Sequence, residues 1–196
     1  MITQIILYIS GDGSNARQII SYFKENQHIK VVGVLSSKAN PKMVDFCSSH
    51  QLAFFDMSHR GFDEYLRISI ELNAKWVVLA GFLKKIPAEI VAHFNERIIN
   101  IHPSLLPKFG GPGMYGRRVH EAVSSSSELF SGISIHLVNN DYDKGRLLFQ
   151  HAVPLAPGEK ANQVEQKVRE LEHLHFAKDL ASYILPLLNH DPSSNN

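Results

Sequence analysis

The chain has 196 residues, of which 44% are hydrophobic and 20% charged, a balance typical of one globular domain and not of a disordered chain. Its formal net charge of +1 argues against a general nucleic-acid binder, which carries a marked basic excess. A single cysteine, no stretch apolar enough to span a bilayer and no signal-peptide pattern at the N-terminus together predict a cytoplasmic protein without a membrane partner.

Short apolar runs alternate with helical stretches through the first 102 residues. Five apolar runs read as strands, at residues 4–10, 29–37, 52–56, 75–82 and 97–102, and the first two read as strands buried in the sheet. Helices are expected between them, at residues 15–26, 41–50, 62–73 and 87–94. Ser14 or Asn15 is expected to cap the first helix. This alternation predicts crossover units and an α/β fold with a doubly wound, mostly parallel sheet.

The pattern changes after residue 102. A loop rich in proline and glycine is followed by a short helix at 117–125 and by two strands, at 131–140 and 145–155. The four-residue connection between these strands is too short for a crossover, so we expect an antiparallel pair. Apolar positions at helical spacing then predict a long C-terminal helix over 161–188. We expect a single domain over residues 1–188 and a disordered tail at 189–196.

The stretch "GDGSN" at 11–15 follows the first predicted strand. A glycine turn at the carboxyl end of a parallel strand exposes backbone N–H groups, and the next helix adds the positive end of its dipole, so the stretch can bind a phosphate. A tight turn without a ligand would have the same sequence. A dinucleotide is the weaker alternative, because Ala16 replaces the third glycine and no acidic residue ends the second strand, although Lys38 would suit a 2′-phosphate. A phosphate monoester suits the turn better.

Polar residues end the fifth predicted strand in "NIHPSLLPKFGG". Asn100 and His102 alternate, so both side chains lie on the same side of the strand, where an amide and an imidazole can surround one small polar atom. They could also be ordinary polar residues at a strand end. Pro103 and Pro107 restrict the following loop and favour a preorganised site. The stretch "NNDYDKG" at 139–145 is dense in carboxylates and amides, although such residues also make ordinary hairpins.

Taken together, "GDGSN", "LAGFLKKI", "NIHPSLLPKFGG", "SGISIHLVNNDYDKG" and "LEH" resemble the phosphoribosylglycinamide formyltransferase family in order and approximate spacing. The resemblance extends over residues 4–185. It implies a Rossmann-like formyltransferase fold and an enzyme of de novo purine biosynthesis. Such an enzyme transfers the formyl group of 10-formyltetrahydrofolate to the amine of glycinamide ribonucleotide and needs no metal. The partners implied are these two small molecules, without nucleic acid, and the chain is expected to be a monomer or homodimer.

The resemblance also implies roles for particular residues. The implied catalytic residues are Asn100, His102 and Asp143. The residues implied to bind the ribonucleotide are Gly13, Ser14, Asn15 and Glu172. The residues implied to bind the folate are Leu83, Lys84, Lys85, Ile86, Asn140, Asp141 and Tyr142. In this mechanism Asn100 and His102 stabilise an oxyanion, while Asp143 raises the pKa of the His102 imidazole and helps to move protons.

Several positions are left open by the sequence. His136 lies on the same side of its predicted strand as Ser134 and could line the site or simply pack. His173 and His175 are expected to be structural or solvated. Either His59 or Arg60 could meet the folate tail. Three features depart from the usual pattern: Lys144 follows the implied catalytic aspartate, Lys84 stands where arginine is common, and the loop 109–118 is unusually long and rich in glycine.

Other functions remain as alternatives. Formyltetrahydrofolate hydrolase, methionyl-tRNA formyltransferase and sugar-amine formyltransferases share the central motif. We expect the first two to be disfavoured, because the chain begins at the first sheet strand and stops after the long helix. A non-catalytic module that binds a phosphorylated metabolite is the remaining alternative, and the co-occurrence of the three implied catalytic residues argues against it.

Overall fold

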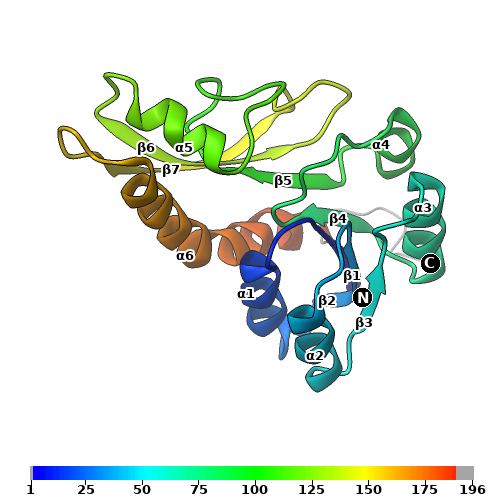
Figure 1. Cartoon of the computed structure of the whole chain (residues 1–196). Helices are drawn as coiled ribbons and strands as arrows, with labels where there is room; N and C mark the ends of the chain where they lie inside the picture. The colour runs from blue at the N-terminus through cyan, green and yellow to red at the C-terminus, as the bar shows by residue number, and fades with distance from the viewer. Residues whose placement is uncertain (1, 189–196) are drawn as a thin grey trace.

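A computed structural model describes residues 2–188 as a seven-stranded sheet with helices on both faces (Figure 1). The strands are β1 (Thr3–Ile9), β2 (Ile29–Ser36), β3 (Ala53–Asp56), β4 (Trp76–Leu79), β5 (Ile98–His102), β6 (Phe130–Leu137) and β7 (Leu147–Pro154). Their order across the sheet is β3-β2-β1-β4-β5-β6-β7, and the first five are parallel. The predicted doubly wound, mostly parallel α/β sheet is therefore confirmed.

The two faces of the sheet carry separate hydrophobic cores because neighbouring strand residues point to opposite sides. In β1, Ile5, Leu7 and Ile9 belong to one core, and Ile6 and Tyr8 belong to the other. The first core packs against helices α1 (Ser14–Phe23), α2 (Pro41–Ser49), α5 (Arg117–Ser124) and α6 (Ala161–Leu188). The second core packs against α3 (Phe62–Glu71) and α4 (Ala88–Phe94). These buried apolar strands need cover on both faces, which the two helix layers provide.

The two C-terminal strands form the predicted antiparallel pair, with Ile133 of β6 opposite His151 of β7. Strand β6 is also antiparallel to β5, so it is the reversed strand of the sheet as the structure describes it. In this register Asn100 lies opposite His136, and His102 lies opposite Ser134. The antiparallel pairing therefore brings Ser134 and His136 of β6, which are distant in the sequence, next to the residues at the end of β5.

The long helix predicted over 161–188 is confirmed, whereas the predicted cap of the first helix is wrong. Gly13 occupies the N-cap position in a left-handed conformation (φ 78°), and the helix begins at Ser14 without a side-chain cap. The Asn15 side chain donates to Glu172 of α6 instead of capping its own helix. Tertiary contact has thus displaced a local interaction. The predicted tail, 189–196, lies outside the described residues.

The single cysteine and the lack of an apolar spanning stretch can both be examined in the described residues. Cys47 is buried in the first core, and burial raises the pKa of its thiol to about 11, which makes it an unreactive packing residue. Within residues 2–188 no helix is both long and apolar enough to cross a membrane.

Candidate active site

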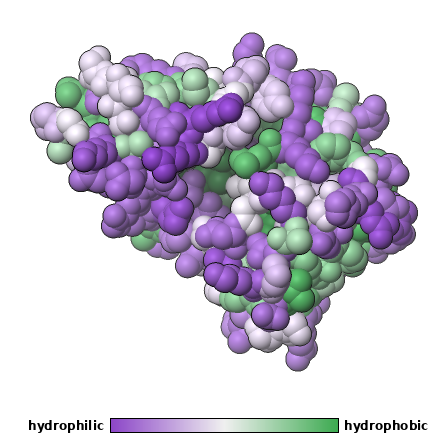
Figure 2. All heavy atoms as spheres, viewed as in Figure 1, coloured by the Kyte–Doolittle hydropathy of each residue, from purple (hydrophilic) through white to green (hydrophobic). Residues whose placement is uncertain are grey.

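A cavity of about 340 Å³ opens at the carboxyl ends of β1, β4 and β5. Its walls also include the loop before α5, the turn between β6 and β7, and one face of α6. The face in Figure 2 is hollowed near its centre, where hydrophobic residues are surrounded by hydrophilic ones. Ligands of open parallel sheets bind at this end of the strands, and the cavity lies where the strand order reverses between β1 and β4.

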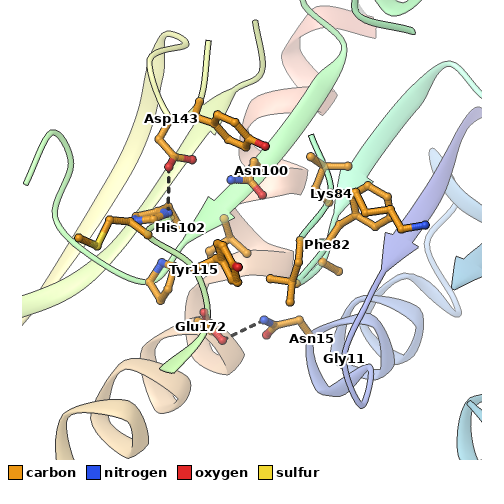
Figure 3. A pocket seen from close by; sticks show the side chains of 18 of the residues that line it. Gly11, Asn15, Phe82, Lys84, Asn100, His102, Tyr115, Asp143 and Glu172 are labelled. Atoms are coloured by element: carbon orange, nitrogen blue, oxygen red, sulfur yellow. Dashed lines mark hydrogen bonds and ion pairs between the residues drawn. The ribbon is translucent and has the colours of Figure 1, made fainter. Parts of the chain in front are cut away.

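Asn100, His102 and Asp143 meet in this cavity (Figure 3). The Asp143 Oδ2 atom lies 3.6 Å from His102 Nδ1, and their side chains are 11% and 4% exposed. Asp143 comes from the turn between β6 and β7, where its backbone is left-handed (φ 54°). Its Oδ2 atom accepts the Gly111 N–H at 2.8 Å, which ties this turn to the glycine-rich loop. The group implied by the sequence is therefore brought together from two separate segments.

The hydrogen bonds of His102 determine which nitrogen faces Asp143. Its Nε2 atom is 2.8 Å from the Phe109 carbonyl oxygen. A carbonyl can only accept, so Nε2 carries the proton of the neutral ring and Nδ1 carries the lone pair. Nδ1 can then take up a proton next to the Asp143 carboxylate.

His136 lines the cavity between Asn100 and Asp143. Its Nδ1 atom donates to the Leu137 carbonyl at 2.7 Å, so the neutral ring accepts at Nε2, where the Asn100 Nδ2 atom lies at 3.1 Å. The same Nε2 atom is 3.7 Å from Asp143 Oδ1. One N–H of the Asn100 amide is thereby used, and the second has no protein partner within residues 2–188. The sequence left open whether His136 lines the site or simply packs, and the structure places it in the cavity lining.

Burial lowers the pKa of His102 below its ordinary value, and this outweighs the nearby Asp143 carboxylate and the Phe109 hydrogen bond, which both raise it. The expectation that Asp143 would make the ring cationic near neutral pH is therefore wrong for the unliganded protein. Burial raises the pKa of Asp143, but the neighbouring His136 and His102 rings and the Gly111 N–H lower it overall. The pair thus consists of a neutral imidazole beside a carboxylate.

The loop behind the site is held by the side chain of Ser134. Its hydroxyl donates to the Ser104 carbonyl at 2.7 Å and accepts the Leu106 N–H at 2.9 Å and the Gln150 amide at 2.8 Å. The Ser104 hydroxyl donates to the Lys108 carbonyl at 2.7 Å. The proline-restricted segment is therefore fixed to β6 and β7 by hydrogen bonds as well as by its own stiffness.

The "GDGSN" turn forms the opposite end of the cavity, with Gly13, Ser14 and Asn15 among its lining residues. Gly13 is required here, because its φ is +78° and an added Cβ would come within 2.6 Å of the Met43 sulfur. The Ser14 N–H is directed to the Asp12 carboxylate at 3.2 Å and lies at the positive end of α1. A ligand phosphate can take up the same N–H groups.

Glu172 of α6 joins this turn to the far wall of the cavity (Figure 3). Its Oε2 atom accepts from Asn15 Nδ2 at 2.9 Å. Burial raises the pKa of the Glu172 carboxyl, which outweighs the opposite effect of the Asn15 hydrogen bond. The Asn15 Oδ1 atom is buried and has no partner among the described residues, so it can accept from a ligand.

The residues implied to bind folate are placed in two ways. Those of the segment after β4 and of the β6–β7 turn line the cavity, namely Leu83, Lys84, Lys85, Ile86, Asp141 and Tyr142. Lys85 Nζ lies over the Tyr142 ring, 5.4 Å from its centroid, and joins the two segments. Asn140 lines a neighbouring shallow depression with Lys85 and Ile86, and not the main cavity. Lys144 is exposed and outside the cavity lining, as are both His59 and Arg60.

Apart from Glu172, sequence reasoning missed the wall made by α5, α6 and the loop before α5. Glu165, Val168 and Arg169 lie on the same face of α6 as Glu172, a spacing of three and four residues that could have indicated them. Tyr115 and His120 line the cavity from the loop and α5. His120 is 5% exposed and its Nδ1 atom has no partner in the described part of the chain. No local pattern distinguishes this histidine from one on an ordinary amphipathic helix.

The fold and the cavity define a doubly wound α/β protein with an imidazole–carboxylate–amide group at one end of a pocket and an anion-binding turn at the other. Residues 3–180 match the family model described as formyl transferase. The chain belongs to the formyl transferase family, in its phosphoribosylglycinamide formyltransferase branch.

Individual relatives give the extent of the similarity. The Escherichia coli K12 phosphoribosylglycinamide formyltransferase is 35% identical over 179 residues, covering 86% of this chain and 81% of the relative. The chloroplastic enzyme of Arabidopsis thaliana is 35% identical over 87% of this chain, which spans 61% of that relative's length. A crystal structure of phosphoribosylglycinamide formyltransferase from Brucella melitensis superposes with a TM-score of 0.81 at 27% identity, covering 93% of this chain and 96% of that one.

Proposed function

We propose that this chain transfers the formyl group of 10-formyltetrahydrofolate to the amine of glycinamide ribonucleotide, a step of de novo purine biosynthesis. The observation that carries the proposal is the shared cavity, with Asn100, His102 and Asp143 at one end and the "GDGSN" turn at the other. A substrate held by its phosphate at the turn extends its amine towards the reacting group. The relatives that bear this name support the choice of substrate.

In the proposed reaction the amine nitrogen attacks the formyl carbon, and the formyl oxygen becomes an oxyanion. The second N–H of the Asn100 amide donates to this oxygen, and a donor of this kind is worth about 3 kcal/mol of barrier. The His102 ring accepts a proton at Nδ1 from the attacking nitrogen, and Asp143 stabilises the resulting cation. The protonated ring strengthens the stabilisation of the oxyanion. The carbon–nitrogen bond to folate then breaks, and the departing nitrogen takes the proton, which gives tetrahydrofolate and the formylated ribonucleotide.

The proposed binding roles follow from position. The N–H groups around Gly13 and Ser14 bind the phosphate, and Asn15 with Glu172 contacts the glycinamide side. The segment 83–86 and the turn 140–142 hold the folate, and Asn140 acts from its edge. The described residues offer hydrogen-bond donors and apolar surface for both substrates. Each step of the proposed reaction is assigned to a protein side chain.

The test is the acceptor dependence of tetrahydrofolate release from 10-formyltetrahydrofolate. Release that requires glycinamide ribonucleotide supports the proposal, and the dephosphorylated glycinamide riboside should give a strongly raised KM because the turn loses its anion. Release with water alone would identify a hydrolase. Release with another sugar amine in place of glycinamide ribonucleotide would show that the enzyme formylates a different acceptor. Phosphate-dependent binding of the ribonucleotide without turnover would identify a binding module.

A further inference from the structure

We propose that His151, His175 and Asp179 bind one divalent transition-metal ion of the zinc class, at a site separate from the cavity. His151 lies on β7, whereas His175 and Asp179 lie one helical turn apart on α6, so both helix side chains point to the same face. The strand and the helix pack together and bring the three groups to one place. None of the three lines the cavity. The inference goes beyond the proposed function and does not depend on it.

The distances suit a small ion. The His151 Nε2 and Asp179 Oδ2 atoms are 2.7 Å apart, and one ligand atom from each of the three residues lies within 4.8 Å of the others. A tetrahedral zinc ion with bonds of about 2.1 Å holds its ligand atoms about 3.4 Å apart, which falls between these two values. The ligand atoms are therefore close enough for side-chain adjustments to form the site.

The main adjustment that metal binding requires is a rotation of one imidazole ring. The His151 and His175 rings stack with centroids 3.6 Å apart and an angle of 13° between their planes. Ring lone pairs lie in the ring planes, so two parallel rings cannot direct both at one ion until one of them turns. His175 is half-buried, so its ring can rotate about its own side-chain bond. His151 is also half-buried, which leaves the cluster open on one side to an entering ion and its water ligands.

The charge of the cluster also favours a cation. Asp179 is 8% exposed, and within residues 2–188 its hydrogen-bond partner is the His151 ring. A buried carboxylate is costly unless it is paired or coordinates a metal. Two imidazoles and one carboxylate form a donor set that suits zinc, nickel or copper better than magnesium or calcium. A bound ion would fasten the edge strand β7 to α6.

A second group of two histidines and an aspartate exists in the cavity, and the test must separate the two. There the His102 Nε2 and His136 Nδ1 atoms already donate to backbone carbonyls, and the carboxylate lies 3.6 and 3.7 Å from the remaining nitrogens. The cluster on β7 and α6 has no comparable pair of backbone bonds among the described residues. Such backbone bonds are usual for metal-ligating histidines, so the experiment has to locate the bound ion as well as detect it.

The experiment titrates the chelator-treated full chain with Zn²⁺ by calorimetry, and with Co²⁺ by its visible absorption. We expect one equivalent to bind, and His175→Ala to weaken binding by more than about 100-fold, because losing even an outer-shell partner of a metal ligand costs about 10–100-fold. His151→Ala and Asp179→Asn should act in the same direction. His28→Ala removes an exposed histidine elsewhere and should leave binding unchanged. Zn²⁺ should raise the Tm of the wild type but not of His175→Ala.

The position of the bound ion is checked by the anomalous signal of zinc in a soaked crystal. The zinc affinity of the His102→Ala variant provides a second check. A zinc peak between β7 and α6, with affinity retained in His102→Ala, supports the proposal. Binding that survives His175→Ala but is lost in His102→Ala would overturn it, as would the absence of binding by the wild type. No formyl donor or acceptor enters these measurements, so their outcome is independent of the proposed activity.

Discussion

Replacing Asp143 by asparagine removes one charge beside His102 and keeps the shape of the side chain. The Oδ2 atom lies 3.6 Å from His102 Nδ1, and two unit charges at this distance attract by about 5 kcal/mol at an effective dielectric constant of 20. Both side chains are well buried, so solvent screens the pair little. Each 1.36 kcal/mol is a factor of ten in rate, so a reaction that passes through protonated His102 should slow by roughly 10³-fold. The asparagine can still accept the Gly111 N–H, so the fold should survive.

The assay measures kcat for tetrahydrofolate release at saturating substrate, together with Tm and the His102 pKa by NMR titration. The pKa of His102 should fall further in Asp143→Asn, because the carboxylate raises it against the effect of burial. Asp45→Asn is the matched control, since it removes one exposed carboxylate from α2. A kcat within tenfold of the wild type, with the His102 pKa unchanged, would refute the assigned pairing.

Four further predictions concern the amide, the turn and the pocket wall. Asn100→Asp places a carboxylate beside the oxyanion and should reduce kcat by more than the roughly 100-fold of one lost donor; a kcat above a tenth of wild type would contradict its role. Ser14→Asp should raise the KM for the ribonucleotide but not for the formyl donor, and an equal change in both would place the phosphate elsewhere. Gly13→Ala should lower the free energy of unfolding by at least about 1–2 kcal/mol in urea titrations, because its φ is +78°, whereas Gly11→Ala meets nothing within 4 Å and should be nearly neutral. Burial lowers the pKa of His120 below its ordinary 6.5, so its contribution to stability is complete above pH 6.5 and is lost as the pH falls towards the folded-state pKa. His120→Gln should therefore flatten the decline of Tm below pH 6.5, and an unchanged slope would assign that decline to other groups.

Much of the fold could be predicted because its signals are local. The apolar run of β1 and the helical spacing over 161–188 reflect burial on both faces of a strand and on one face of a helix, and both elements lie where the sequence placed them. The reversal of β6 against β5 had no such signal, because a loop and a short helix separate the two strands. The cap of α1 was missed since Asn15 makes its bond to α6, far along the chain.

By itself, the sequence determined the alternation of strands and helices, the glycine turn at the end of β1 and the placement of Asn100 and His102 on one side of β5. These follow from the repeat of two residues along a strand and from backbone preferences, which act over a few neighbouring residues. Only the tertiary structure decided that His136 and His120 face the cavity, that His102 is neutral despite Asp143, and that His151 meets His175 and Asp179. Each of these depends on which segments pack together and on how far water is excluded, and neither is encoded in the spacing of residues along the chain.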